Sequence, residues 1–97
     1  MKLEGLSIIG FRCGSAGGEV FHGINPATGE TLATDYHSAN EVEVGEAADL
    51  AEVAFESFAS RSGKERAVFL RKIATNIESV VEAIKSRGAA ETGLPEA

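Results

Sequence analysis

The side chains with the chemistry for nucleophilic catalysis or metal binding are Cys13, His22 and His37. A cysteine nucleophile needs a neighbouring base and a group that stabilises the oxyanion, and no motif connects either histidine to Cys13. A zinc site needs four ligands at short, characteristic spacings, whereas these three residues are nine and fifteen positions apart and no fourth ligand accompanies them. We therefore expect Cys13 to be a structural or exposed thiol, and we predict no catalytic residue and no metal site.

Four acidic residues are candidates for a pair of carboxylates that exchanges protons with a substrate: Glu30, Glu41, Glu43 and Glu46. Helix capping and exposure to water account for them without catalysis. The glycine-rich segment Gly14–Gly18 (GSAGG) is a candidate phosphate loop, but it lacks both the GxxxxGKS/T and the GxGxxG patterns. We expect a plain turn there and predict no cofactor-binding residue.

The composition excludes several classes of protein. The chain has 97 residues and a net charge of −6, from 15 acidic and 9 basic residues, which argues against nucleic acid as a partner. Cys13 is the only cysteine, so no intrachain disulfide is possible and a reducing compartment is expected. No apolar run reaches the roughly 20 residues of a membrane span, and no signal peptide is recognisable. We expect a cytoplasmic protein without a membrane partner.

The composition also predicts a weakly stable unit. Hydrophobic residues make up 43% of the chain, but much of this fraction is alanine and there is no tryptophan. Alanine contributes little buried area, and a chain of this size buries only about 60–65% of the surface that its unfolded state exposes.

The strongest structural signal is a long helix predicted over residues 62–92. Apolar residues recur along it every three or four positions, which places them on one face: Leu70, Ile73, Ala74, Ile77, Val80, Val81 and Ile84. Ser62 and Glu65 have the spacing of a capping box, and Gly93 is suited to end the helix. We expect a bend near residues 76–79, where polar residues cluster.

A shorter helix is predicted over residues 40–59. Asn40 and Glu43 have the spacing of a capping box, and the apolar face is rich in alanine, which lets a neighbouring helix or sheet approach closely. The short turn at 60–63 predicts that the two helices are antiparallel or crossed neighbours. Gly88 lies on the apolar face of the long helix, where we expect it to let another backbone approach closely.

The first part of the chain, residues 1–38, has the pattern of a small antiparallel β unit. Short β-prone runs flank Gly10, which indicates a tight turn. Strands are predicted at 19–24 and 31–37, joined by an NPATGE turn. The expected fold class is α+β: this β unit followed by two helices, with residues 1–97 forming a single unit.

Four landmarks, in order, resemble the N-terminal region of aldehyde dehydrogenases. They are FHGINPATGE at Phe21–Glu30, an acidic alanine-rich helix ending in Ala54-Phe55, the spacing R-A-x-F-L-x-x-I-A at Arg66–Ala74 followed by Ile77-Glu78, and ETGLP at Glu91–Pro95. The likeness runs from about Ile8 to Ala97. The sequence is similar above all to the branch that contains 2-oxoglutarate semialdehyde dehydrogenases and NADP-dependent fatty aldehyde dehydrogenases. Gly45 and Gly88 depart from the helix formers that are common in the family.

The resemblance implies an NAD(P)-dependent enzyme that oxidises an aldehyde, with a semialdehyde as a candidate, to a carboxylate. In the family, a catalytic cysteine, a glutamate base and a Rossmann-like cofactor fold lie beyond the region that matches here, so Cys13 does not correspond to the nucleophile. The matching segment is implied to be the N-terminal part of the cofactor-binding domain. Backbone carbonyls near Gly23 and Ile24 correspond to a place where some members hold a monovalent cation. Its other ligands lie outside these residues, so we predict no bound ion.

Two hypotheses for function follow. In the first, the chain is the N-terminal structural segment of an aldehyde dehydrogenase, it is inactive alone, and its partner is the remainder of the dehydrogenase chain, which uses NAD or NADP. In the second, it is a stand-alone, non-catalytic interaction module that self-associates through its helix faces. Complete closure of the two helices on each other would argue against the first hypothesis. The aldehyde substrate, the choice between NAD and NADP, and the oligomeric state depend on other residues.

Overall fold

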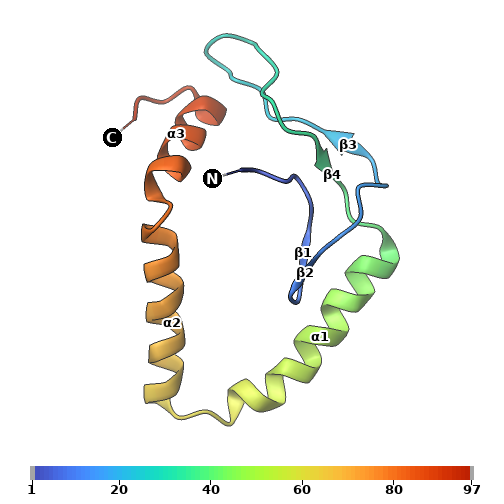
Figure 1. The fold of residues 1–97 in the computed structure, drawn as a ribbon, viewed down its shortest axis with the longest axis vertical. Coiled ribbons are helices and arrows are strands. Elements are labelled where there is room, and N and C mark those ends of the chain that lie inside the picture. Colours follow the sequence, from blue (N-terminus) through green and yellow to red (C-terminus); the bar gives the residue numbers. More distant parts are fainter. Residues whose placement is uncertain (1, 97) are drawn as a thin grey trace.

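The computed structural model describes residues 2–96 and contains, within them, four short strands followed by three helices. The strands are β1 (Ile8–Ile9), β2 (Arg12–Cys13), β3 (Val20–Phe21) and β4 (Tyr36–His37), and the helices are α1 (Glu41–Ala59), α2 (Gly63–Glu78) and α3 (Val81–Thr92). Figure 1 shows that the chain traces an open ring, with α3 returning beside the loop between β3 and β4. The expected α+β class is confirmed. None of these helices is long and apolar enough to cross a bilayer.

The strands of the described chain form two separate antiparallel pairs instead of one sheet. In the first pair, Ile8 lies opposite Cys13 and Ile9 lies opposite Arg12. Gly10 connects these strands with a φ of 60°, a left-handed conformation that glycine adopts without steric cost. The tight turn predicted at Gly10 is therefore confirmed.

The second pair, β3 and β4, is shorter than the two strands predicted at 19–24 and 31–37. The register places Val20 opposite His37 and Phe21 opposite Tyr36. The rings of Phe21 and Tyr36 stack with their centroids 5.6 Å apart. Thr34 has a φ of 97°, which takes the backbone out of the extended conformation. This distortion, which the sequence pattern does not reveal, confines regular pairing to two residues on each strand.

Asn40 caps α1 as predicted, whereas the cap of α2 is incomplete. The Asn40 Oδ1 atom accepts a hydrogen bond from the backbone N–H of Glu43 at 2.8 Å, and the Glu43 carboxylate accepts one from the backbone N–H of Asn40 at 3.2 Å. At α2, the Ser62 Oγ atom accepts from the backbone N–H of Glu65 at 3.2 Å. The Glu65 carboxylate, however, accepts from Arg61 at 3.1 Å instead of returning to Ser62. The full capping box predicted at Ser62 is therefore wrong, because Arg61 competes for the carboxylate.

The single long helix predicted over 62–92 is also wrong, because the structure contains α2 and α3 with a break at Ser79 and Val80. The hydroxyl of Ser79 donates to the carbonyl of Asn76 at 2.6 Å, and Val80 leaves helical geometry with φ −123° and ψ 17°. Side-chain hydroxyls that bind backbone carbonyls compete with the regular helix ladder. The break falls at the edge of the polar cluster where a bend was expected. Gly93, with φ 71°, ends α3 as predicted.

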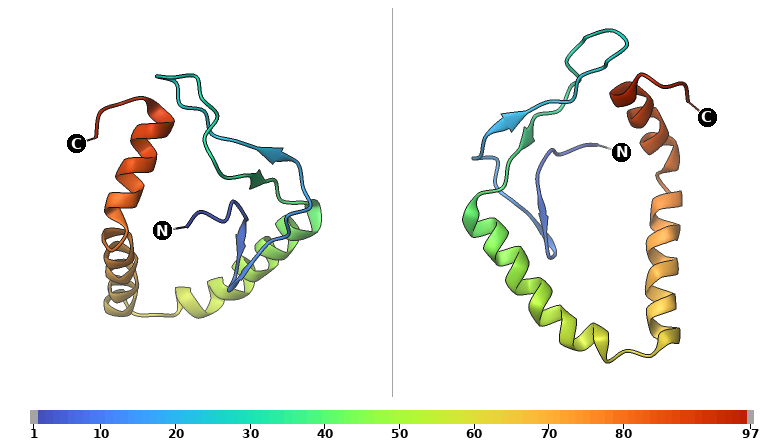
Figure 2. Two further views of the ribbon diagram at one scale, coloured as in Figure 1. Left: turned by 45° about the horizontal axis from the view of Figure 1, so that its top comes forward. Right: turned by 180° about the vertical axis from the view of Figure 1, so that it is seen from behind.

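The helices α1 and α2 do not pack along their lengths, so the predicted antiparallel or crossed arrangement is wrong. Figures 1 and 2 show them diverging from the turn that joins them, near which the rings of Phe58 and Phe69 make an edge-to-face contact with centroids 5.2 Å apart. Ser62 is extended, with φ −64° and ψ 161°, so the turn leads the chain away from α1. Among the residues that the structure describes, Ile9 is the only buried hydrophobic side chain. The chain has almost no core of its own.

Candidate functional site

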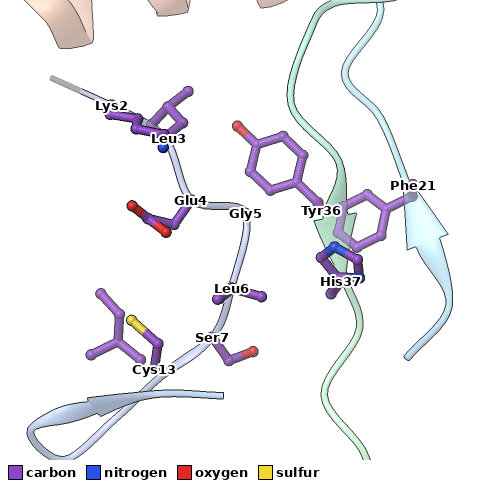
Figure 3. A pocket seen from close by; sticks show the side chains of 11 residues that line it. Lys2, Leu3, Glu4, Gly5, Leu6, Ser7, Cys13, Phe21, Tyr36 and His37 are labelled. Atoms are coloured by element: carbon purple, nitrogen blue, oxygen red, sulfur yellow. The ribbon is translucent and has the colours of Figure 1, made fainter. Parts of the chain in front are cut away.

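Cys13 lies in β2 with an exposed side chain. It lines a shallow hollow of about 430 Å³ together with Tyr36 and His37 (Figure 3). Within residues 2–96, no hydrogen bond joins the thiol to either histidine. The hollow therefore contains the Cys13 thiol and the His37 imidazole, but no hydrogen bond joins them, and a cysteine nucleophile requires such a contact with a base.

The two histidines have separate surroundings. The Nε2 atom of His22 lies 2.6 Å from the Oδ1 atom of Asp35, and this pair is exposed. His37 is half-buried in β4, where it pairs with Val20. Over the described part of the chain, no group of three or more histidine, cysteine, aspartate or glutamate side chains is arranged to hold a metal ion. The structure thus does not bring Cys13, His22 and His37 together as a ligand set.

Gly23 and Ile24, which the resemblance linked to a cation, belong to the loop between β3 and β4. The carbonyl of Gly23 accepts a hydrogen bond from the N–H of Leu32 at 2.9 Å, and Ile24 forms an isolated antiparallel bridge with Thr31. A Cβ atom on Gly23 would lie 3.3 Å from the Nη2 atom of Arg87. The glycine therefore lets α3 approach this loop closely.

Arg87 fixes α3 to the β3–β4 region. Its Nε atom donates to the Glu91 carboxylate at 2.7 Å and its Nη1 atom donates to the carbonyl of Ala33 at 3.2 Å. The guanidinium carbon also lies 5.8 Å from the centre of the Tyr36 ring, within the range of a cation–π contact. The hydrogen bond to Glu91 is the main reason why the pKa of Arg87 is raised. Polar contacts of Arg87, and not an apolar core, thus join α3 to the β3–β4 region.

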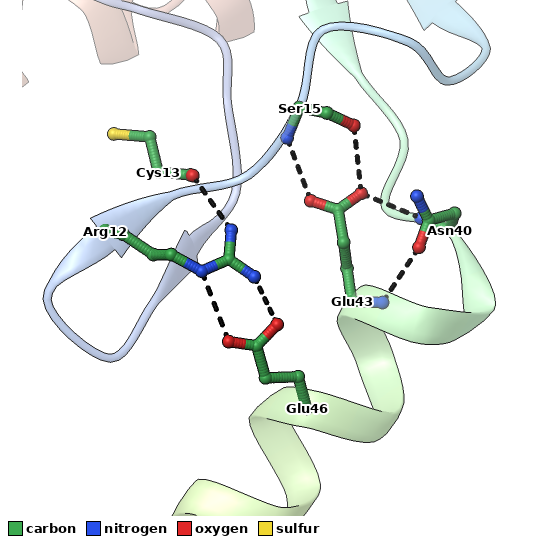
Figure 4. A network of polar contacts seen from close by, with 6 residues as sticks. All are labelled: Arg12, Cys13, Ser15, Asn40, Glu43 and Glu46. Carbon is green, nitrogen blue, oxygen red and sulfur yellow. Dashed lines mark hydrogen bonds and ion pairs between the residues drawn. The ribbon is translucent and has the colours of Figure 1, made fainter.

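Glu43 joins the start of α1 to the loop that follows β2 (Figure 4). Its side chain is buried, with 7% exposed, and its carboxylate accepts hydrogen bonds from the backbone N–H of Ser15 at 2.9 Å and from the backbone N–H of Asn40 at 3.2 Å. The bond from Ser15 is the main cause of a lowered pKa of Glu43, and burial opposes it. Beside this cluster, Arg12 forms a two-pronged ion pair with Glu46. Both carboxylates are occupied by structural partners.

The same geometry decides whether the GSAGG loop fits a dinucleotide. The N–H of Ser15, which a phosphate would need, already donates to the Glu43 carboxylate. A second anion placed there would be repelled by that carboxylate. The amide of Glu43 at the start of α1 is likewise used by the cap from Asn40. Neither of these two amides is therefore free to bind a phosphate group of NAD(P).

The most prominent feature of the chain is uncovered surface. Its accessible area is 7531 Å², whereas a folded monomer of 10.1 kDa exposes roughly 5,300 Å². Its radius of gyration is 16.9 Å, compared with about 12.5 Å for a compact domain of this length. The chain thus exposes about 2,200 Å² more than a self-sufficient domain would.

Part of this surface is an apolar groove between α1 and α2, next to the turn that joins them. It has a volume of about 1010 Å³, and its apolar lining consists of Ala51, Ala54, Phe55, Phe58, Val68 and Phe69. Phe55 is 70% exposed and Val68 is 64% exposed. Apolar surface of this kind is suited to contact with another segment of protein. We call this feature the α1–α2 groove.

Comparison with known proteins agrees with the landmarks. The aldehyde dehydrogenase family model matches residues 13–97. The chain belongs to the aldehyde dehydrogenase family. It is 41% identical over 80 residues to 5-carboxymethyl-2-hydroxymuconate semialdehyde dehydrogenase of Escherichia coli, which covers 82% of this chain and 17% of that protein. No solved structure gives a significant match.

Two further aldehyde dehydrogenases match over nearly the whole chain. Alpha-ketoglutaric semialdehyde dehydrogenase 2 of Azospirillum brasilense is 33% identical over 98% of this chain and 18% of its own length. Aldehyde dehydrogenase (NAD(P)+) 1 of Saccharomyces cerevisiae is 32% identical over 94% of this chain and 18% of its own length. The chain therefore spans less than a fifth of the length of the relatives it matches.

Sequence reasoning missed the two arginines that hold this aldehyde dehydrogenase segment together. Arg12 pairs with Glu46, 34 positions away, and Arg87 donates to Ala33, 54 positions away. A single sequence gives no signal that links a charge to so distant a partner. The contact between Arg87 and Glu91, four positions apart on one helix, is the part that spacing could have found.

Proposed function

We propose that this chain is the N-terminal structural segment of an NAD(P)-dependent aldehyde dehydrogenase that oxidises an aldehyde to a carboxylate. The observation that carries the proposal is the uncovered surface: the chain exposes about 2,200 Å² more than a compact domain of its mass. The remainder of the dehydrogenase chain is the partner that covers this area. Family membership and the small share of each relative that is matched support the same conclusion.

The substrate class and cofactor follow from the relatives. Two of them are named for semialdehydes, which favours a semialdehyde as the substrate. The yeast relatives carry NAD(P)+ in their names, which favours NAD or NADP as the hydride acceptor. A cytoplasmic location is proposed because the single cysteine suits a reducing compartment.

In this enzyme the segment contributes scaffold and no catalytic group. The cluster around Glu43 and the Arg12–Glu46 ion pair fix the first hairpin to α1, and Arg87 fixes α3 to the β3–β4 region. The exposed faces of α1 and α2 are then held at defined positions for the rest of the enzyme to pack on. The catalytic cysteine and the cofactor-binding residues belong to that other part.

A chimera tests the scaffold role. The matching segment of the E. coli semialdehyde dehydrogenase is replaced by this chain, with Arg12 and the first hairpin included, and NAD(P)H production is followed at 340 nm with the substrate of that enzyme. We expect a folded, active chimera, whereas the purified 97-residue chain alone produces no NAD(P)H. NAD(P)H production by the chain alone would overturn the proposal.

Cys13 supplies the matched control. Because its thiol has no catalytic role in the proposal, the Cys13→Ser chimera is expected to keep the activity of the parent chimera within about twofold, which is the scale of a surface substitution of less than 0.5 kcal/mol. Abolished activity in a folded Cys13→Ser chimera would assign the thiol to catalysis and contradict the scaffold role. Extension of the reading frame beyond Ala97 by several hundred codons is an independent expectation.

A further inference from the structure

We infer that Arg87 on α3 selects the register in which the β3–β4 hairpin (residues 20–37) pairs, and thereby closes the NPATGE turn at its tip. This inference goes beyond the proposed function because it concerns two alternative pairings within the chain itself. Three observations support it: a change of register along the hairpin, a strained threonine at that change, and a carbonyl group there that accepts a hydrogen bond from Arg87.

The register changes between the strands and the turn. Phe21 lies opposite Tyr36, and the same register continued toward the turn would place Ile24 opposite Ala33. Ile24 instead forms its bridge with Thr31. Between these two pairs the returning strand therefore has two residues more than its partner, which is the defining feature of a β-bulge.

The bulge contains a strained residue. Thr34 has a φ of 97°, and it is the only residue other than glycine with a positive φ in the described part of the chain. A positive φ is unfavourable for a β-branched side chain, and continuous extended pairing would relieve this strain. Strain of this kind persists only where surrounding contacts hold the backbone in place.

Burial does not choose between the two registers. They differ by two residues, so each side chain keeps its face of the hairpin in both. Ile24 is 58% exposed, so little apolar burial depends on whether it lies opposite Thr31 or opposite Ala33. Because the strain at Thr34 favours continuous pairing, a contact from outside the hairpin has to favour the bulge.

Arg87 supplies that contact. Its Nη1 atom donates to the carbonyl of Ala33 at 3.2 Å, and no other donor to this carbonyl is present within residues 2–96. Its Nε atom donates to Glu91, four positions further along α3, at 2.7 Å, which holds the guanidinium in place. A change in the φ of Thr34 rotates the peptide group that carries the Ala33 carbonyl. The hydrogen bond from Arg87 therefore holds Thr34 in its strained conformation.

Helix α3 also contacts the turn that this register closes (Figure 1). A Cβ atom on Gly93 would lie 3.1 Å from the ring of Pro26, so the end of α3 lies against the turn. In the observed register the N–H of Asn25 donates to the carbonyl of Glu30 at 2.9 Å and closes the turn. Continuous pairing would lengthen the loop to residues 25–32. Docking of α3 and closure of the turn are thus coupled.

Nuclear Overhauser contacts measured on the 97-residue chain test the inference. Residues opposite each other at a position without hydrogen bonds bring their Hα atoms close together. A contact of Ile24 Hα with Thr31 Hα therefore reports the bulged register, and a contact with Ala33 Hα reports the continuous register. We expect the first contact in the wild type. Arg87→Met is expected to shift the ratio of the registers toward the continuous one by about tenfold or more, which is the scale of a hydrogen bond from a charged donor.

A second substitution supplies the rescue. Glycine adopts a positive φ without steric cost, so with Thr34→Gly the bulge no longer depends on Arg87. Adding Thr34→Gly to Arg87→Met is expected to raise the share of the bulged register about fivefold or more, because the strain is removed. Arg66→Met is the matched control on α2, where the arginine side chain makes no hydrogen bond within residues 2–96, and it should leave the ratio unchanged.

The far end of the hairpin provides a check on folding. Val20 lies opposite His37, and the contact between their Hα atoms should persist in every variant because this pair precedes the bulge. Loss of this contact in Arg87→Met would show that Arg87 holds the whole hairpin and does not select its register.

Three further results would overturn the inference. The first is a wild-type chain without the contact between Ile24 and Thr31. The second is a ratio that Arg87→Met leaves unchanged or that Arg66→Met shifts equally, and the third is the absence of recovery with Thr34→Gly. The register is measured by magnetic resonance and the proposed function by NAD(P)H production, so failure of one is distinguishable from failure of the other.

Discussion

At the scale of single residues, ionic and polar side chains hold the segments of this chain together, whereas an apolar core does so in most domains. Ile9 is the only buried hydrophobic side chain in the described chain, while Glu43 is buried and holds the loop at Ser15 against the start of α1. A buried carboxylate is stable there because it accepts several hydrogen bonds, which satisfies the charge that burial would otherwise penalise. Ionised Glu43 therefore contributes to holding the loop at Ser15 against α1.

Acid should weaken the wild-type chain through this residue. The pKa of Glu43 is lower in the folded chain than in the unfolded chain, mainly because of the hydrogen bond from Ser15. Its stabilising contribution is therefore complete above the unfolded pKa and is lost as the pH falls through the folded pKa. We expect the melting temperature to fall in this acid range for the wild type and to depend less on pH in Glu43→Gln, measured by circular dichroism.

The control for this prediction is Glu56→Gln, which removes a carboxylate from the same helix outside the cluster. The side chain of Glu56 makes no hydrogen bond within residues 2–96, so its variant should follow the wild-type pH profile. If Glu43→Gln and Glu56→Gln shift the profile equally, the special role of Glu43 is refuted.

At the scale of elements, each helix has local signals that fix its start, its end or its weak point. The first helix begins at a complete capping box, in which the side chains of Asn40 and Glu43 each accept from the backbone of the other. The break between α2 and α3 follows from polar side chains near Ser79. Such local bonds matter more than usual here because packing contributes little to the helices.

Loss of the first cap should be measurable. We expect Asn40→Ala to lower the free energy of unfolding by about 1 kcal/mol, because the N–H of Glu43 loses its acceptor. Urea unfolding followed at 222 nm gives the difference. Asn40→Asp keeps an acceptor at the cap and should retain the stability, so equal losses in both variants would contradict the capping explanation.

Gly88 offers a stabilising substitution inside α3. A Cβ atom at this position meets nothing within 4 Å, so the close backbone approach predicted there does not occur in this chain. We expect Gly88→Ala to raise the free energy of unfolding by about 0.5–1 kcal/mol through helix propensity.

Gly93→Ala is the opposite control, since Gly93 has a φ of 71° and a Cβ there would lie 3.1 Å from the ring of Pro26. It is expected to destabilise the chain in the same urea titration. If Gly93→Ala raises the free energy of unfolding, or Gly88→Ala lowers it, helix propensity and backbone strain do not govern the stability of this helix.

At the scale of the whole molecule, the chain is an open ring closed by few contacts. Its extents are 49 × 35 × 18 Å, and α2 is connected to the remainder mainly through the turn at one end and the break before α3 at the other (Figure 2). The described residues leave much of the apolar face of α2 uncovered, with Leu70 at 61% exposed and Ile77 at 52% exposed. Elements with few buried contacts unfold locally at a small cost in free energy.

Hydrogen exchange should show that α2 opens more easily than the start of α1. In the 97-residue chain at low concentration, we expect the amides of α2 to exchange faster than those in the first turns of α1, which the Glu43 cluster anchors. In the active chimera with the E. coli dehydrogenase, the amides of α2 should become protected because the rest of that enzyme covers the helix. Protection of α2 that is the same in both proteins would show that this face is not covered on assembly.

The family and the class of each segment could be predicted from the sequence. The lengths of the strands and the contacts between distant segments could not. The cap at Asn40, the turn at Gly10 and the end of α3 at Gly93 were predictable because each depends on residues within a few positions. The strand at 31–37 was overestimated because the strained backbone at Thr34 has no signature in the alternation of residue types. For the candidate site, the sequence pointed to apolar helix faces, while the α1–α2 groove depends on the angle between helices.

The sequence by itself determined the class of each segment, the membership in the aldehyde dehydrogenase family and the excess of apolar helix surface, because periodicity, caps and motifs are local properties of the chain. Only the tertiary structure decided that α1 and α2 diverge, that Arg12 finds Glu46 and that Arg87 finds Ala33. These outcomes depend on how distant segments meet in space. The energy of such contacts is a property of pairs of residues, and no single position in the sequence carries it.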